Sequence, residues 1–219
     1  MATTSVAPSA STTSQDDLDA LLREIAPLRA GSPLPPQGAW SDEDYLALTD
    51  GCNRPIEFTD GCVQQLPTPT FTHQAVLLAL YRSLHDYLTV RGGIAMVAGL
   101  RLRIREGKFR EPDVLVLRDR SDPRCQDRYW SGADLVVEVV SPDDPARDLV
   151  EKRVDYAEAG VPEYWIVDPR NETIAVLALE GTSYGERGVY ARGDSAASPS
   201  LDGFTADVTA LFDAPEPAG

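Results

Sequence analysis

Residues 135–169 read LVVEVVSPDDPARDLVEKRVDYAEAGVPEYWIVDP, and this stretch decides the fold. It begins with a valine-rich apolar run, Leu135–Val140, which is typical of a buried strand. Pro145–Ala159 then has the pattern of a helix that is closed by Gly160. Glu163–Val167 is a further apolar strand. This alternation of strand, helix and strand predicts an α/β protein.

The residues on either side of this stretch extend the same mixture of elements. Two or three more strands follow it, and many Ser, Thr and Pro residues precede the first helix. We expect a mixed central sheet flanked by helices, with additional β-hairpins near both ends. The expected elements are helices at Asp42–Leu48, Thr72–Val90 and Val208–Phe212, a hairpin of Ile56–Phe58 and Val63–Leu66 around Asp60-Gly61, and strands at Ile94–Arg105 and Asp113–Leu117.

The length of 219 residues suits one domain with tails. We expect an N-terminal tail at residues 1–36, disordered or weakly helical, a domain at 37–213, and a C-terminal tail at 214–219. The three cysteines are odd in number and form no CxxC pair, so we expect reduced thiols. The sequence shows no targeting signal and no apolar run long enough to span a bilayer, which favours the cytoplasm.

The formal net charge of −15 argues against a nucleic-acid partner, because phosphate binding usually needs a basic surface. One local patch is basic: Arg101, Arg103 and Arg105 alternate along a predicted strand, and Lys108 and Arg110 follow. These residues could form a phosphate-backbone track, or they could be a solvated, charged sheet edge.

Two acids stand where a buried strand is expected. Glu138 lies in the middle of Leu135–Val140, and Asp113 opens the run Asp113–Leu117. An ionised carboxylate inside a buried strand costs several kcal/mol unless a cation compensates it. A salt bridge, or a strand end that reaches water, is the alternative explanation for each acid.

Lys152 lies on the helix that follows Glu138. Leu149, Lys152 and Tyr156 are spaced to share one helical face, and we expect that face to point toward the sheet. Lys152 could instead form a surface pair with Asp148, four residues earlier. Two carboxylates and a lysine together suit metal-assisted phosphoryl chemistry. The acids would hold Mg²⁺ or Mn²⁺, and the lysine would act on water and phosphate.

The chain resembles the Uma-two family of restriction-endonuclease-like proteins, within the PD-(D/E)XK nuclease superfamily. The resemblance covers roughly residues 40 to 212 and is most specific from Glu138 to Pro169. The superfamily pattern places a lysine two positions after the second acid, and Val140 stands there, so the resemblance implies that Lys152 takes that role. The matching segments are Glu57–Gly61, Thr72–Gln74, Glu111–Val114, Val136–Pro142, Asp148 with Lys152 and Tyr156, and Gly160–Pro169.

The resemblance implies a restriction-endonuclease-like fold and a metal-dependent endonuclease that acts on DNA, where a homodimer would suit double-strand cleavage. Asp113, Glu138 and Lys152 are the expected catalytic residues, with the two acids as metal ligands. Glu57, His73 and Tyr156 are accessory candidates, although Glu57 and His73 could be surface residues and Tyr156 a core residue. The alternatives are a non-catalytic member that binds nucleic acid or protein, and a hydrolase of smaller phosphoesters, which the acidic composition suits better.

Overall fold

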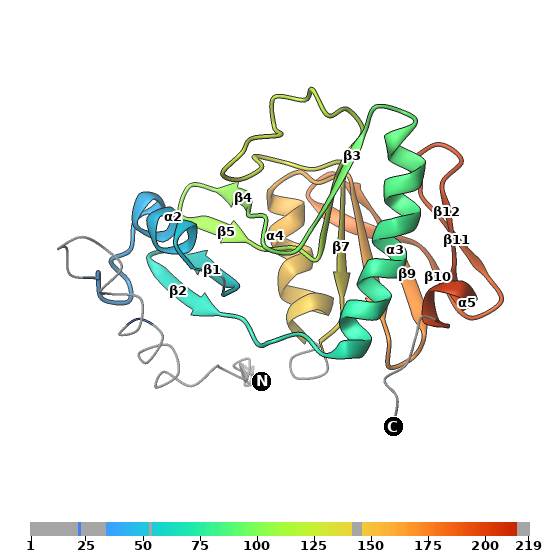
Figure 1. Ribbon diagram of the computed structural model, residues 1–219, viewed down its shortest axis with the longest axis horizontal. Coiled ribbons are helices and arrows are strands. Elements are labelled where there is room, and N and C mark those ends of the chain that lie inside the picture. Colours follow the sequence, from blue (N-terminus) through green and yellow to red (C-terminus); the bar gives the residue numbers. More distant parts are fainter. Residues whose placement is uncertain (1–21, 23–33, 53, 142–145, 214–219) are drawn as a thin grey trace, which may run out of the picture.

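The computed structural model describes residues 22, 34–52, 54–141 and 146–213. Its centre is a six-stranded sheet with the strand order β10-β9-β8-β7-β6-β3 (Figure 1). β7 and β8 run parallel, and the other neighbouring pairs are antiparallel, so the predicted mixed sheet is confirmed. The strands are β3 (Ile94–Val97), β6 (Val114–Leu117), β7 (Leu135–Val139), β8 (Glu163–Asp168), β9 (Thr173–Glu180) and β10 (Ser183–Tyr190).

Helices cover both faces of this sheet because its central strands are apolar on both sides. The covering elements are α3 (Phe71–Thr89), η2 (Arg147–Glu151), α4 (Lys152–Glu158) and α5 (Val208–Phe212). α3 and α5 pack on the face that carries Val137 and Val139, and α4 lies on the other side of β7 (Figure 1). There Tyr156 packs in the same cluster as Val136. Successive strand residues point to opposite faces, so Glu138 shares the face of Val136 and points toward η2 and α4.

A second sheet, with the order β2-β1-β5-β4, adjoins the first. Tyr45, Phe58 and Phe109 stack in its core. The elements around it are α2 (Asp42–Asp50), β1 (Ile56–Thr59), β2 (Cys62–Gln65), β4 (Leu102–Arg105) and β5 (Lys108–Arg110). β1 and β2 form the predicted N-terminal hairpin, and its turn holds Asp60 and Gly61 at φ 47° and 82°. The predicted C-terminal hairpin is β11 (Ser195–Ala197) paired with β12 (Thr205–Asp207).

The prediction of a single strand over Ile94–Arg105 is wrong. β3 joins the six-stranded sheet, whereas β4 joins the four-stranded one. Gly99 separates them at φ +96°, a conformation that side-chain-bearing residues rarely adopt. The chain therefore leaves one sheet at this glycine and enters the other.

The prediction that Leu149 lies on the inward face of its helix is also wrong, since Leu149 is exposed. The helix begins with a π turn, in which the Lys152 N–H donates to the Arg147 carbonyl, five residues earlier. A π turn holds more residues than an α turn. Asp148, four residues before Lys152, therefore shares its face, whereas Leu149, three residues before it, does not. Asp148 is buried for this reason.

Among the described residues, no helix has both the length and the apolar character that a membrane crossing requires. Cys52, Cys62 and Cys125 are free thiols, as predicted. Most of the predicted N-terminal tail, the predicted helix start at Pro145 and the whole predicted C-terminal tail lie outside the described residues.

Candidate active site

The antiparallel pairing of β6 and β7 brings Asp113 and Glu138 together. Val114 pairs with Val137, so Asp113, one residue before Val114, lies across from Glu138. The Val139 N–H donates a 2.8 Å hydrogen bond to Asp113 Oδ2. The register of two apolar strands therefore places both predicted acids at one end of the strand pair.

Glu138 is 1% exposed and has two polar partners on α4. Lys152 Nζ lies 2.8 Å from Oε2 of Glu138. The Tyr156 hydroxyl donates a hydrogen bond to Oε1. Because Lys152 and Tyr156 are four residues apart on one helix, both reach the same carboxylate. Tyr156 thus contacts the site as well as the core.

Lys152 is 6% exposed and has a second carboxylate partner. Asp148 Oδ1 lies 3.0 Å from Lys152 Nζ, and Asp148 Oδ2 accepts a hydrogen bond from the Ser141 N–H. The pair of Asp148 and Lys152 that the sequence suggested as a surface alternative exists, but it is buried and lies within the site. Burial lowers the pKa of Lys152, but Glu138 and Asp148 outweigh it and hold that pKa above its ordinary value. The lysine therefore remains an ammonium ion.

His73 lies in the first turn of α3, where Thr70 caps the helix by accepting the His73 N–H. Its Nε2 is 3.1 Å from Asp113 Oδ2. Burial lowers the pKa of His73, but the hydrogen bond to Asp113 and the charges of Asp113 and Asp148 together raise it above its ordinary value. Its Nδ1 is buried and has no partner among the described residues. His73 is therefore an inward-facing neighbour of the acid pair.

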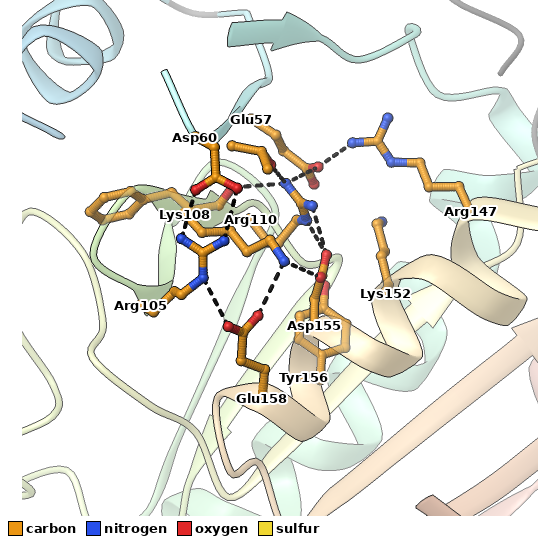
Figure 2. A network of polar contacts seen from close by, with 12 residues as sticks. Glu57, Asp60, Arg105, Lys108, Arg110, Arg147, Lys152, Asp155, Tyr156 and Glu158 are labelled. Atoms are coloured by element: carbon orange, nitrogen blue, oxygen red, sulfur yellow. Dashed lines mark hydrogen bonds and ion pairs between the residues drawn. The ribbon is translucent and has the colours of Figure 1, made fainter. Parts of the chain in front are cut away.

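Glu57 is fully buried on β1 and belongs to an adjoining ion-pair network (Figure 2). Arg147 donates to its Oε2, Arg110 Nη1 lies 3.4 Å from the same oxygen, and the Glu111 N–H donates to Oε1. Burial alone would raise the pKa of Glu57, but Arg147, Arg110 and Lys152 lower it to about 2. Glu57 is thus an ionised, buried acid beside Lys152, and the alternative of a surface acid is wrong.

The site holds more negative than positive charge. Glu138 and Asp148 both contact Lys152, and Asp113 lies across from Glu138. Burial is the main cause that raises the pKa of Glu138 well above its usual range. Lys152 opposes that rise, whereas Asp113 and Asp148 add to it. A buried carboxylate in this setting holds a proton or needs a further cation.

The donor chemistry of the site fits a hard divalent cation. No group of three or more His, Cys, Asp and Glu side chains within the described ranges forms a complete protein cage for a metal. Mg²⁺, however, usually binds through one or two carboxylates and keeps several waters. Asp113 and Glu138 provide such a pair, and each carboxylate oxygen has more than one lone pair.

The predicted basic track does not form a free basic surface. Each of its five residues contacts a carboxylate, and Lys108 and Arg110 are largely buried by those contacts. The pairs are Arg101–Asp50, Arg103–Asp42, Arg105–Asp60, Lys108–Asp155 and Arg110–Asp155, at 2.9, 3.0, 2.8, 2.6 and 2.6 Å. Phosphate binding at this track would require displacement of those carboxylates, and the role stays a prediction.

The site includes two residues that the search for site residues passed over. Asp148 completes the carboxylate group around Lys152, and its position four residues before the lysine was the available signal. Arg147 contacts Glu57, and no local pattern relates residues so far apart in the sequence. The structure thus joins Asp113, Glu138 and Lys152 with His73, Tyr156 and Asp148.

Comparisons with known proteins agree with this fold. A family model named Uma2, described as "Putative restriction endonuclease", matches residues 42–209 and so spans every candidate residue. The solved structure of "a putative nuclease belonging to DUF820" from Anabaena variabilis ATCC 29413 matches with a TM-score of 0.62 and 19% identity. The match covers 76% of this chain and 96% of that chain, and at this identity it shows the fold alone. No curated protein matches the sequence.

Proposed function

The chain belongs to the Uma2 family, and from that membership we propose that it is a divalent-metal-dependent endonuclease that hydrolyses phosphodiester bonds in DNA. One observation carries the proposal: the buried Glu138 shares Lys152 with Asp148 and lies across from Asp113. This arrangement has more negative than positive charge, and its carboxylates are hard oxygen ligands. Family membership alone does not prove activity, so the site's chemistry supports the rest of the proposal.

Asp113 and Glu138 would hold the metal. Mg²⁺ or Mn²⁺ bound there would supply a nucleophilic water at neutral pH and stabilise charge on the phosphoryl oxygens. The Val139 N–H donates to Asp113 Oδ2, and His73 Nε2 lies beside the same oxygen. The Tyr156 hydroxyl donates to Glu138. These contacts orient the two acids before any ligand arrives, which reduces the reorganisation that catalysis would require.

Lys152 would act as an electrostatic group and not as a proton acceptor. Its raised pKa keeps the ammonium protonated, because Glu138 and Asp148 oppose the effect of its burial. An ammonium can donate hydrogen bonds to a water or to a non-bridging phosphate oxygen, and it offsets charge that develops in the transition state. Asp148 and Glu138 hold Lys152 in place from two sides.

A hydrolase of smaller phosphoesters is the second candidate. The net charge of −15 and the pairing of every residue of the basic track favour it, because a long nucleic acid needs more contacts with phosphate than a single diester. The same site would serve both functions, and they differ only in what they require of the surface around that site.

Cleavage assays with two substrates distinguish these functions. Supercoiled plasmid and bis(p-nitrophenyl) phosphate are incubated with Mn²⁺, Mg²⁺ or EDTA, using the parent and Glu138→Gln purified in parallel. The proposal expects nicked or linear plasmid with the parent and metal, and none with EDTA or with the variant. Hydrolysis of the small diester alone would favour the second candidate. Metal-independent cleavage, or equal cleavage by the variant, would contradict both.

A further inference from the structure

Arg147 differs from Arg105 and Arg110, the two other arginines of the network in Figure 2, in how its guanidinium is used. Arg105 donates through Nε, Nη1 and Nη2 to Glu158 and Asp60, so all three of its nitrogens have partners. Arg110 likewise uses all three, on Asp155, Thr59 and Glu57. Every nitrogen of these two guanidinium groups already has a partner, and a further anion would compete with those partners.

Arg147 is held through one nitrogen only. Its Nη2 donates to Glu57, while its Nε and Nη1 have no partner among the described residues. The Arg147 side chain is 13% exposed, and neither nitrogen is among the fully buried, unpartnered side-chain atoms of the described residues. This edge of the fork can therefore donate to an oxyanion, for which a guanidinium has matching geometry.

The position of Arg147 relates this open edge to the candidate active site. Arg147 precedes Asp148, and in Figure 2 its side chain and that of Lys152 extend from one helix toward Glu57. Burial lowers the pKa of Arg147, but Glu57, Asp148 and Glu138 raise it overall. The guanidinium thus projects from the helical segment that also carries Asp148 and Lys152, which contact each other, and it faces Glu57.

Glu57 is suited to orient Arg147. It is 1% exposed, anchored by the Glu111 N–H and by Arg110, and its pKa of about 2 keeps it ionised. A fixed, ionised carboxylate holds one edge of the guanidinium and leaves the other edge in a defined direction. Such preorganisation is what an anion-binding site requires.

We propose that Arg147 binds a phosphodiester oxygen of the substrate at the candidate active site and that Glu57 is its positioning residue. The inference deepens the proposed function and rests on it. Lys152 and Arg147 would then contact phosphate from the same helix, with the acids Asp113 and Glu138 on the facing strands.

Kinetics of Mn²⁺-dependent cleavage of a fluorescent 20-bp DNA duplex test this proposal. Arg147→Gln should raise KM about tenfold or more, because a charge-assisted contact with phosphate is lost. Arg192→Gln, which changes an arginine that contacts Glu172 and Asp213 outside this network, should stay within about twofold of the parent. The affinity for Mn²⁺, measured by direct titration, should be unchanged in Arg147→Gln.

A double-mutant cycle tests the positioning role of Glu57. Glu57→Gln should raise KM by part of the Arg147→Gln effect, and the double variant should be no worse than Arg147→Gln alone. Additive effects would show that Glu57 acts only through stability and would overturn its positioning role.

The outcomes distinguish a failure of this inference from a failure of the proposed endonuclease function. A parent without metal-dependent cleavage removes the proposed function, and the inference with it. A parent that cleaves, beside a folded Arg147→Gln with parental KM, overturns the inference alone. If Arg147→Gln does not fold, the parent is titrated with the dinucleotide dTpdT while the Arg147 Nε–H resonance is followed by NMR. A saturable shift supports the proposal, and an unmoved resonance contradicts it.

Discussion

Two clusters of charged residues meet at η2 and α4, and they are built in opposite ways. In the first, on the side of β5, Asp155 contacts both Lys108 and Arg110, and Glu158 contacts Lys108 and Arg105 (Figure 2). Acids and bases there match one another. In the second, Lys152 contacts Glu138 and Asp148, and Asp113 lies across from Glu138. His73, which contacts Asp113, adds a positive charge only when it is protonated.

We propose that the first cluster has a structural role and the second a functional one. A balanced cluster is satisfied by the protein itself, and it joins the small sheet to the helix α4. An unbalanced, buried cluster is costly to the fold, and proteins keep such sites where a ligand completes them. The comparison predicts that changes in the first cluster affect stability and that changes in the second affect chemistry.

Glu138→Ala should have the largest effect on activity. The loss of a metal ligand removes several kcal/mol of transition-state stabilisation, which corresponds to a loss of cleavage on the order of 10³-fold or more. Cleavage is measured on plasmid with Mn²⁺, and circular dichroism checks that the fold survives. Near-normal nicking by a folded variant would show that Glu138 is not part of the chemistry.

Asp155→Asn should have the largest effect on stability. The change removes the negative charge between two largely buried cations, Lys108 and Arg110, and we expect a loss of about 3 kcal/mol in the free energy of unfolding. Urea unfolding measures it. Asp213→Asn is the matched control, because its pair with Arg192 is exposed and should contribute less than about 1 kcal/mol. Equal losses in both variants would end the distinction between the clusters.

Lys152→Met should reduce turnover by about a hundredfold without weakening Mn²⁺ binding. Methionine keeps the length and apolar packing of the lysine stem, while the ammonium that faces Glu138 and Asp148 is lost. Single-turnover cleavage and a Mn²⁺ titration separate the two effects. A variant with parental turnover would show that the role of Lys152 is structural.

Glu111→Gln should have the smallest effect, and it should depend on pH. Burial and the nearby Glu57 raise the pKa of Glu111 to about 7, although the Ile56 N–H and Arg101 oppose this. A folded-state pKa above the unfolded value means that stability is present below the unfolded pKa and is lost as pH rises through about 7. As the pH rises from 5 to 8, the free energy of unfolding of the variant should therefore increase by about 2 kcal/mol relative to that of the parent. Urea unfolding at both pH values measures the gain, and a pH-independent difference would refute it.

Much of the fold could be predicted from local patterns. The apolar strands around Glu138, the hairpin turn at Asp60 and Gly61, and the helix Val208–Phe212 each have a short-range signature, and each is observed. An acid inside an apolar strand is also a local signal, and it indicated Glu138 before any partner was known. The split of Ile94–Arg105 was missed because a strand pattern does not say which sheet a strand joins.

The partners of the charged residues could not be predicted in the same way. Arg105 contacts Asp60 and Glu158, which are 45 and 53 residues away in the sequence. Only the shared pairing of β1 and β4 with β5, and the packing of β4 against α4, bring them together. A basic stripe in the sequence is therefore a paired one in the structure. No local sequence pattern predicts the π turn before Lys152. Because of that turn, Asp148 lies on the inward face of the helix and Leu149 does not.

The central claim is that the unbalanced cluster is completed by a divalent cation, and a thermal melt tests it most directly. The parent and Glu138→Gln are melted at neutral pH, each in EDTA and in Mn²⁺. We predict that Mn²⁺ stabilises the parent by roughly 2.7 kcal/mol at a hundredfold excess over Kd and leaves the variant almost unchanged. In EDTA the variant should melt at or above the parent, because it lacks a buried carboxylate whose charge is opposed by burial and by Asp113 and Asp148. A parent that does not respond to Mn²⁺, together with a variant that melts lower in EDTA, would show that Glu138 and Lys152 form a structural ion pair and would contradict the account.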